Sequence, residues 1–205
     1  MDADEDLGAT SIIDFRNYQD NVRDGDIHHL THGFATRARL QEANGDTHNH
    51  AMWFGGQNDY AEDGVLTEAF AVMDAWLTAI AEDESEAALY DKVRVHRPED
   101  LRDACFTPGP DGGERIEQTQ VYQGTNECSD SYYPPFSSPR QVAGAEVAND
   151  VVKCVLKPLD RSDYQVTFTD EEWSRLKATF PDGVCDFTRR GVGQVPSENW
   201  LRYNG

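Results

Sequence analysis

The hydrophobic pattern predicts its strongest secondary structure between His50 and Ala81. A short apolar run, Ala51–Phe54, is followed by a Gly55–Gly56 break and a polar loop. Beyond this loop, apolar residues recur at steps of four, three, four and three, at Leu66, Phe70, Met73, Leu77 and Ile80, with Trp76 beside them. Because an α-helix turns once every ~3.6 residues, this spacing predicts a helix over 66–81 that buries these side chains. A short buried strand followed by such a helix is half of a βαβ unit.

The other half of that unit lies upstream. Ser11–Phe15 is typical of a short strand, and apolar residues recur at four-residue steps in a predicted helix from His29 to Ala43. Asn44 and Gly45 supply a left-handed stop for this helix. The order strand, helix, strand, helix predicts two parallel strands joined by a right-handed crossover. Because two strands do not make a stable sheet, we expect further strands later in the chain or in a larger protein.

The remaining pattern predicts shorter elements. They are a disordered acidic lead-in over 1–10, a strand over 92–96, a helix beginning at 98, an edge strand over 115–122 and a helix over 145–156. Thr169 and Glu172 have the spacing of a capping box, which predicts a helix that turns Trp173, Leu176 and Phe180 inward.

Charge excludes one class of partner. The 205-residue chain has a formal net charge of −20 and a sequence pI of about 4.4. Its acidic residues are spread along the chain, which favours a halophilic, solvated surface over a site for cationic partners. Nucleic acid is excluded as a partner because phosphate binding needs a basic surface. We also expect no membrane association, because no apolar run reaches the length of a membrane span, and the acidic start at Met1–Asp6 is not a signal peptide.

The four cysteines all lie in the second half of the chain. They are Cys105, Cys128, Cys154 and Cys185. None of them forms the close Cys-x-x-Cys pair that zinc sites usually contain, so we expect no metal at these residues. Two disulfides fit better and imply an oxidising compartment, with four buried free thiols as the alternative. We expect Cys105–Cys128 and Cys154–Cys185, although four cysteines permit three pairings.

The densest group of polar side chains follows the first predicted strand. It comprises Asp20, Asp24, Asp26, His28, His29 and His32. Loops beyond the carboxyl ends of parallel strands line the ligand crevice of open α/β sheets. A histidine oriented by a carboxylate supplies a base that titrates near neutral pH, which predicts acid–base chemistry at His28 with Asp20 and Asp26. His28 and His32 are four residues apart and on a helix would share a metal ion. The third interpretation is an ordinary polar loop, and His48 and His50 are predicted to be structural.

Other catalytic signatures are missing from the sequence. There is no Gly-x-Ser-x-Gly nucleophile elbow, phosphate-binding loop or dinucleotide fingerprint. We therefore expect no cofactor, and no serine nucleophile within these 205 residues.

Several stretches resemble an uncharacterised family of mostly secreted bacterial proteins, domain-of-unknown-function family 6351, which belongs with the α/β-hydrolases. The matching stretches are Ile12–Tyr18, Gly25–His28, Phe34–Leu40, Met73–Leu77, Ser137–Gly144, Ala148–Cys154, Leu156–Pro158 and Phe180–Asp186. The chain is similar to the C-terminal portion of the family's longer members. The resemblance implies an α/β fold, in which 11–90 form the C-terminal βαβα part of an α/β-hydrolase-like sheet and 91–205 form an irregular, disulfide-stapled α+β extension.

The resemblance also implies roles for the polar residues. In the similar ends of tannase and feruloyl-esterase sequences, the catalytic acid follows the penultimate strand, which favours Asp20. The catalytic histidine normally follows the last strand, but the loop from Gly55 to Gly64 contains no histidine, so His28 is the nearest substitute.

Three hypotheses for the function remain open. The first is an extracellular fragment of a carboxylic-ester hydrolase that lacks the nucleophile, is inactive as an isolated chain, and has a small ester or the missing N-terminal half as its partner. The second is a non-catalytic secreted binding or structural module. The third is a metal-binding module built on Asp26, His28 and His32.

Overall fold

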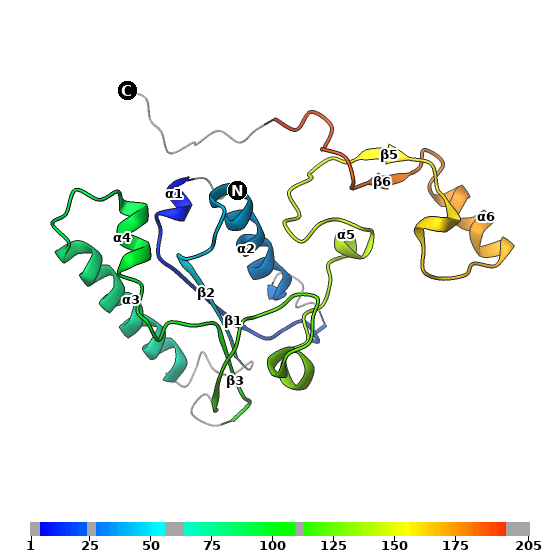
Figure 1. The fold of residues 1–205 in the computed structure, drawn as a ribbon. Helices are drawn as coiled ribbons and strands as arrows, with labels where there is room; N and C mark the ends of the chain where they lie inside the picture. The colour runs from blue at the N-terminus through cyan, green and yellow to red at the C-terminus, as the bar shows by residue number, and fades with distance from the viewer. Residues whose placement is uncertain (1–4, 24–27, 56–63, 110–112, 196–205) are drawn as a thin grey trace. The chain divides into compact units, whose positions relative to one another are not determined.

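A computed structural model of the chain describes residues 5–23, 28–55, 64–109 and 113–195 (Figure 1). The chain divides into two compact units, Met1–Ser138 and Pro139–Gly205. The first unit contains α1 (Glu5–Gly8), β1 (Ile12–Asn17), α2 (Thr31–Asn44), β2 (His50–Gly55), α3 (Gly64–Glu82), α4 (Leu89–Val95), β3 (Ala104–Phe106), β4 (Arg115–Glu117) and a π-helical turn (Cys128–Tyr132).

A mixed, parallel-rich sheet organises the first unit. Its strand order is β1-β2-β3-β4. Strand β1 pairs in parallel with β2 along its whole length, from Ile12 opposite His50 to Asn17 opposite Gly55. Strand β2 also runs parallel to β3, whereas β4 pairs with β3 in the antiparallel direction. The predicted parallel pairing of the first two strands is therefore confirmed.

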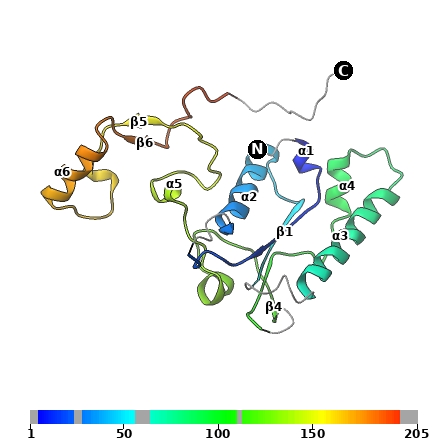
Figure 2. The ribbon, with the colours of Figure 1, turned by 180° about the vertical axis from the view of Figure 1, so that it is seen from behind.

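Helices α2 and α3 cover opposite faces of this sheet. Trp53 of β2 belongs to the core cluster on the α3 side, while its neighbour Phe54 makes an edge-on ring contact with Phe34 of α2. Adjacent residues of a strand point to opposite faces, so the two helices cannot share one. The same arrangement is visible from the front and from behind (Figures 1 and 2). The three parallel strands follow one another across the sheet in sequence order, while the helices that connect them lie on opposite faces. The two crossovers therefore have opposite hands, and one departs from the right-handed rule.

Helix α3 buries a different side from the one that the sequence predicts. Its buried residues are Val65, Ala69 and Trp76, and Ile80 is packed against the same cluster. Phe70 and Leu77, predicted to be buried, are 69% and 51% exposed. The fully buried Trp76 determines which side is buried, because its indole N–H also donates to the Val93 carbonyl at 2.9 Å. The prediction was therefore right for Trp76 and Ile80 and wrong for Phe70 and Leu77.

This helix also changes the expectation about apolar runs. By length and composition alone, Gly64–Glu82 is long and apolar enough to cross a membrane. In the structure one side of this helix packs on the sheet through Trp76 and its buried neighbours, and 17% of the apolar window is buried.

Several local predictions for the middle of the chain were wrong. The stretch predicted as a strand at 92–96 lies mostly in α4, whose Val93 side chain is buried in the core. The segment from Pro98 is a turn closed by the Leu101 N–H, which donates to the Pro98 carbonyl at 3.0 Å. The predicted edge strand over 115–122 is confirmed only for Arg115–Glu117.

The first residues are more ordered than predicted. Within the expected disordered lead-in, 5–8 form α1. The Asn49 side-chain amide donates to the carbonyls of Leu7 and Thr10, both at 2.7 Å, and thereby holds this segment against the start of β2. The division between the units falls after Ser138 rather than at the sequence-based boundary near 90, because β3 and β4 extend the first sheet.

The second unit is small and irregular. It contains α5 (Pro139–Val142), β5 (Val155–Lys157), a 3₁₀ turn (Arg161–Asp163), α6 (Asp170–Thr179) and β6 (Val184–Asp186). The predicted helix over 145–156 was wrong: Asn149 adopts a positive φ, which an α-helix does not allow, and the stretch ends in β5. The capping box at α6 is confirmed, with Trp173 buried, but Phe180 is 44% exposed rather than inward.

Each unit carries one disulfide, and both predicted pairings are confirmed. Cys105 of β3 is linked to Cys128 in the first unit. Cys154 is linked to Cys185 in the second, where it joins the two paired strands β5 and β6. Two disulfides are typical of proteins in an oxidising compartment.

The side that α3 buries predicts unequal costs for two aromatic truncations. Trp76→Ala removes a fully buried side chain and its hydrogen bond, so it should lower the free energy of unfolding by about 3–5 kcal/mol. Phe70→Ala should change it by about 0.5 kcal/mol or less in the isolated chain, because Phe70 is mostly exposed. Urea unfolding followed by tryptophan fluorescence or circular dichroism measures both. Equal costs would contradict this orientation of the helix.

Candidate functional site

His28 lies at a cavity beside β1. The cavity has a volume of about 360 Å³ and is lined by Asp14, Phe15, Arg16, Asn17, Gln19 and His28. His28 itself is exposed and sits just before α2. The structure therefore places this histidine at a cavity that includes the second half of β1 and the start of the loop that follows it.

Asp20 is a buried carboxylate with two backbone partners. One carboxylate oxygen accepts from the Leu30 N–H at 2.9 Å, and the other accepts from the Phe136 N–H at 2.8 Å. These bonds hold the loop after β1 against the start of α2 and against the end of the first unit. Nearby, the Tyr18 hydroxyl donates to the Pro134 carbonyl at 2.9 Å. Burial, with the negative charge of Asp20 adding to it, raises the pKa of Tyr18 to about 12.

The structure does not bring the three predicted catalytic residues into contact. No hydrogen bond joins Asp20 and His28, which both lie in the described ranges. Asp26 lies outside the described residues. Their catalytic roles therefore stay predictions.

The metal-binding hypothesis depends on the same loop. Because α2 begins at Thr31, His28 precedes the helix, and the four-residue spacing to His32 does not place both on one helical face. Among the described residues, no group of three His, Cys, Asp or Glu side chains is placed to hold a metal ion. That statement does not cover the proposed ligand set of Asp26, His28 and His32, because Asp26 lies outside the described residues.

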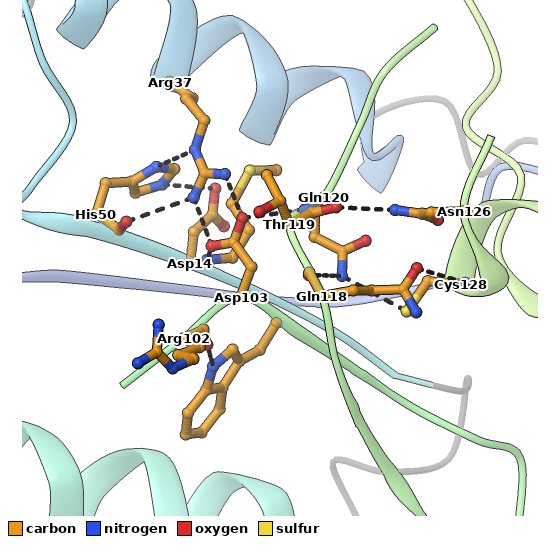
Figure 3. Close-up of polar contacts among 12 residues, drawn as sticks. Asp14, Arg37, His50, Arg102, Asp103, Gln118, Thr119, Gln120, Asn126 and Cys128 are labelled. Atoms are coloured by element: carbon orange, nitrogen blue, oxygen red, sulfur yellow. Dashed lines mark hydrogen bonds and ion pairs between the residues drawn. The ribbon is translucent and has the colours of Figure 1, made fainter. Parts of the chain in front are cut away.

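A charged cluster lies between α2 and the sheet, and we define it as Asp14, Arg37, His50 and Asp103 (Figure 3). Arg37 reaches from α2 and makes a bidentate ion pair with Asp103, with its Nη2 donating to Asp103 Oδ1 at 2.7 Å. Arg37 Nε also donates to His50 Nδ1 at 3.2 Å. On the far side of the imidazole, His50 Nε2 lies 3.6 Å from Asp14 Oδ2.

Asp103 connects three segments of the first unit. Besides Arg37, it accepts from the Met52 N–H of β2 at 2.9 Å and from the Gln120 N–H at 3.0 Å. Burial raises the pKa of Asp103, but the hydrogen bond and charge of Arg37, helped by the two N–H groups, outweigh it. The pKa therefore lies below its ordinary value, and Asp103 is ionised near neutral pH.

His50 is held in its neutral form. Because Nδ1 accepts from Arg37, the proton of the ring lies on Nε2, which faces Asp14. Burial lowers the pKa of His50, the positive charge of Arg37 lowers it further, and the nearby Asp14 opposes both. The net direction is downward, so the ring stays uncharged at neutral pH.

Close approach of α2 to this cluster depends on Gly33. A Cβ atom at this position would lie 2.8 Å from both Arg16 Nε and Asp14 Oδ2. Real Cβ atoms do not come so close to polar atoms. Glycine therefore allows the helix backbone to lie directly on the ion pair between Asp14 and Arg16.

The geometry of the charged cluster indicates a structural role. Both ring nitrogens of His50 face cluster residues, and His50 is the first residue of β2, away from the carboxyl ends of the strands. This position is as predicted for His50. His48 likewise pairs with Asp46, whose other oxygen accepts from the Tyr90 hydroxyl at 2.8 Å.

Most of this cluster has no signature in the sequence. Its one usable signal was Asp14, a carboxylate inside the apolar run Ile12–Phe15, which indicates a charged partner because buried charges are paired. Nothing in the local pattern points to Arg37 or Asp103, which are far apart in sequence.

The model of the Tannase-like family of unknown function (DUF6351) matches residues 1–196. No curated protein and no solved structure matches the chain.

The neutral His50 predicts a specific pH dependence of stability. In the unfolded chain the imidazole gains a proton near pH 6.5, whereas the folded state resists protonation because its pKa is lowered. The contribution of His50 to the free energy of unfolding should therefore be fully present above about pH 6.5. It should decrease as the pH drops below this value, by up to ~1.4 kcal/mol per pH unit.

His50→Asn isolates this contribution. Its amide oxygen can still accept from Arg37, but the side chain does not titrate, so the decrease between pH 7 and 5 should become shallower. His29→Asn, at a histidine outside the charged cluster, should keep the wild-type slope. Urea unfolding at a series of pH values measures all three proteins, and identical slopes would refute the assignment.

Proposed function

The chain belongs to the Tannase-like family of unknown function (DUF6351), and we propose that it is the C-terminal part of a secreted α/β-hydrolase-like protein that cleaves carboxylic esters. Tannases are carboxylic-ester hydrolases, and the family model covers residues 1–196. On this proposal, the nucleophilic serine belongs to a part of the protein outside these 205 residues.

The burial of the sheet supports a larger protein. All six residues of β2 are buried, whereas five of the six residues of β1, the edge strand, are only half-buried. Strands of parallel sheets are usually covered on both faces, with neighbours on each side. On the proposal, β1 and β2 are the last two strands of a hydrolase sheet and α3 is its final helix.

A second support is the exposed α3 stripe, which we define as Leu66, Phe70, Met73 and Leu77. Phe70 and Leu77 are more than half exposed, although apolar side chains at helical spacing are usually buried. Glu68 of the same helix pairs with Arg115 of β4, at the far edge of the sheet. At 3.6 residues per turn, the stripe lies nearly opposite Glu68. The stripe therefore lies on the side of α3 that is directed away from β4 and towards the β1 edge of the sheet. The rest of a hydrolase sheet and its helices would lie beyond that edge.

Asp20 and His28 have distinct roles in the proposed enzyme. His28 takes the proton from the serine hydroxyl and returns it to the leaving alcohol, while Asp20 orients the imidazole. The carboxylate of Asp20 already accepts two backbone N–H groups, yet a carboxylate has about four lone-pair sites and so can accept the imidazole N–H as well.

The disulfides and the charge fit an extracellular, salt-rich setting. Cys105–Cys128 and Cys154–Cys185 would persist in an oxidising compartment, and a net charge of −20 would keep the surface solvated in concentrated salt.

One observation favours the alternative, a non-catalytic secreted module that binds a partner or has a structural role. Asp20 is buried in backbone hydrogen bonds and does not contact His28. A carboxylate whose only task is to hold a loop against α2 would have the same partners.

The discriminating experiment uses the complete protein. The reading frame that precedes the Met1 codon is sequenced, and the chain is expressed together with the encoded upstream part. If that part carries Gly-x-Ser-x-Gly, the assembled protein should hydrolyse p-nitrophenyl acetate. His28→Ala should then lower kcat/KM by about 10²–10⁴-fold, because general-base catalysis typically contributes that much. The isolated chain should be inert towards the same ester.

His29→Ala is the matched control, since it removes a neighbouring imidazole and should leave kcat/KM within about twofold. Full activity in His28→Ala would remove this histidine from the mechanism. Complete inactivity of the assembled wild-type protein would favour the non-catalytic module.

A further inference from the structure

A second cavity lies on the other side of the charged cluster. It has a volume of about 390 Å³, and its lining includes Arg37, His50, Arg97, Arg102 and Asp103. Asp14 lines the cavity that contains His28, whereas Arg37 and His50 line this one. The charged cluster therefore lies between the two cavities, and the second cavity is separate from the proposed catalytic residues.

The negative groups of this second cavity are already engaged. Asp103 is bound by Arg37 and by two backbone N–H groups. Glu117, the other acidic residue in the lining, pairs with Arg115 at 3.3 Å. Neither carboxylate makes an ion pair with the remaining two arginines, Arg97 and Arg102, in the described part of the chain.

Among the described residues, no carboxylate is in hydrogen-bond or ion-pair contact with either of these two arginines. Arg97 donates only to backbone carbonyls, to His48 and to Leu101, the latter at 2.8 Å from Nη2. Arg102 has an exposed side chain that makes no hydrogen bond or ion pair in the part of the chain that the structure describes. In a protein with a net charge of −20, three arginines and two carboxylates line this cavity, so its lining is net positive.

Electrostatic repulsion among the arginines of this cavity affects the pKa of Arg97. Burial lowers the pKa of Arg97, Asp103 raises it, and the charges of Arg37 and Arg102 lower it again. The positive groups are thus close enough to disfavour one another, and an anion between them would relieve that cost.

We propose that this cavity is a binding site for a small oxyanion, a carboxylate or a phosphate, held by Arg97 and Arg102. The guanidinium fork matches both anions, because two parallel N–H groups can donate to two oxygens. Thr47 and Thr119 also line the cavity and add hydroxyl donors. The site is independent of the hydrolase proposal, since it uses none of its catalytic residues.

Isothermal titration calorimetry of the isolated chain tests this site directly. Sodium phosphate and sodium malonate are the probes, each titrated at an ionic strength held constant with sodium chloride. Wild-type protein should show saturable binding of at least one probe. Arg102→Gln should raise Kd by about tenfold or more, since a hydrogen bond to a charged group contributes ~1.5–3 kcal/mol and tenfold is ~1.4 kcal/mol.

Arg94→Gln is the matched control. Arg94 is an exposed arginine of α4 outside the cavity, so its loss changes the net charge equally and should alter Kd by about twofold at most. Arg102→Lys keeps the charge but not the fork and should recover part of the affinity. Unchanged urea midpoints would establish that the variants are folded.

The two probes distinguish the source of the anion: preference for malonate indicates a carboxylate ligand, and preference for phosphate a phosphorylated one. Absence of saturable binding by both, or equal weakening in Arg94→Gln and Arg102→Gln, overturns the proposal.

Discussion

The ion pair between Arg37 and Asp103 is the interaction on which the first unit most depends. Asp103 precedes β3, accepts the Met52 N–H of β2 and the Gln120 N–H, and is held by an arginine from α2. One ionised carboxylate therefore joins a helix, a central strand and a segment that follows the edge of the sheet. Removing one partner of such a mostly buried pair leaves an uncompensated charge, which costs more than the pair itself contributes.

The charged cluster that contains this pair lies between the two cavities. On one side, Asp14 borders the cavity of His28, which extends to the carboxyl end of β1. On the other side, Arg37 and His50 border the arginine-lined cavity. Helix α3 lies on the opposite face of the sheet and contributes to neither; its exposed stripe is instead the surface that favours a larger hydrolase-like protein.

The sequence predicted the features that depend on local pattern or on a covalent bond. These were the parallel pairing of β1 and β2, the left-handed stop at Gly45, the capping box at Thr169 and both disulfides. It failed where tertiary contacts decide. Helix α3 is apolar on two adjacent sides, so only Trp76 and its bond to Val93 select the buried one. The charged cluster was missed because its members meet only in the folded chain, and no local pattern determines whether His28 and Asp20 come into contact.

A double-mutant cycle on the Arg37–Asp103 pair tests the central claim most directly. Arg37→Met, Asp103→Leu and the double variant are compared by urea unfolding at neutral pH. Each single change should cost about 3 kcal/mol or more, and the double variant should cost clearly less than their sum, with a coupling above ~1.5 kcal/mol. Costs that add to within about 0.5 kcal/mol would show that the two residues act independently and that the fold does not depend on their pairing.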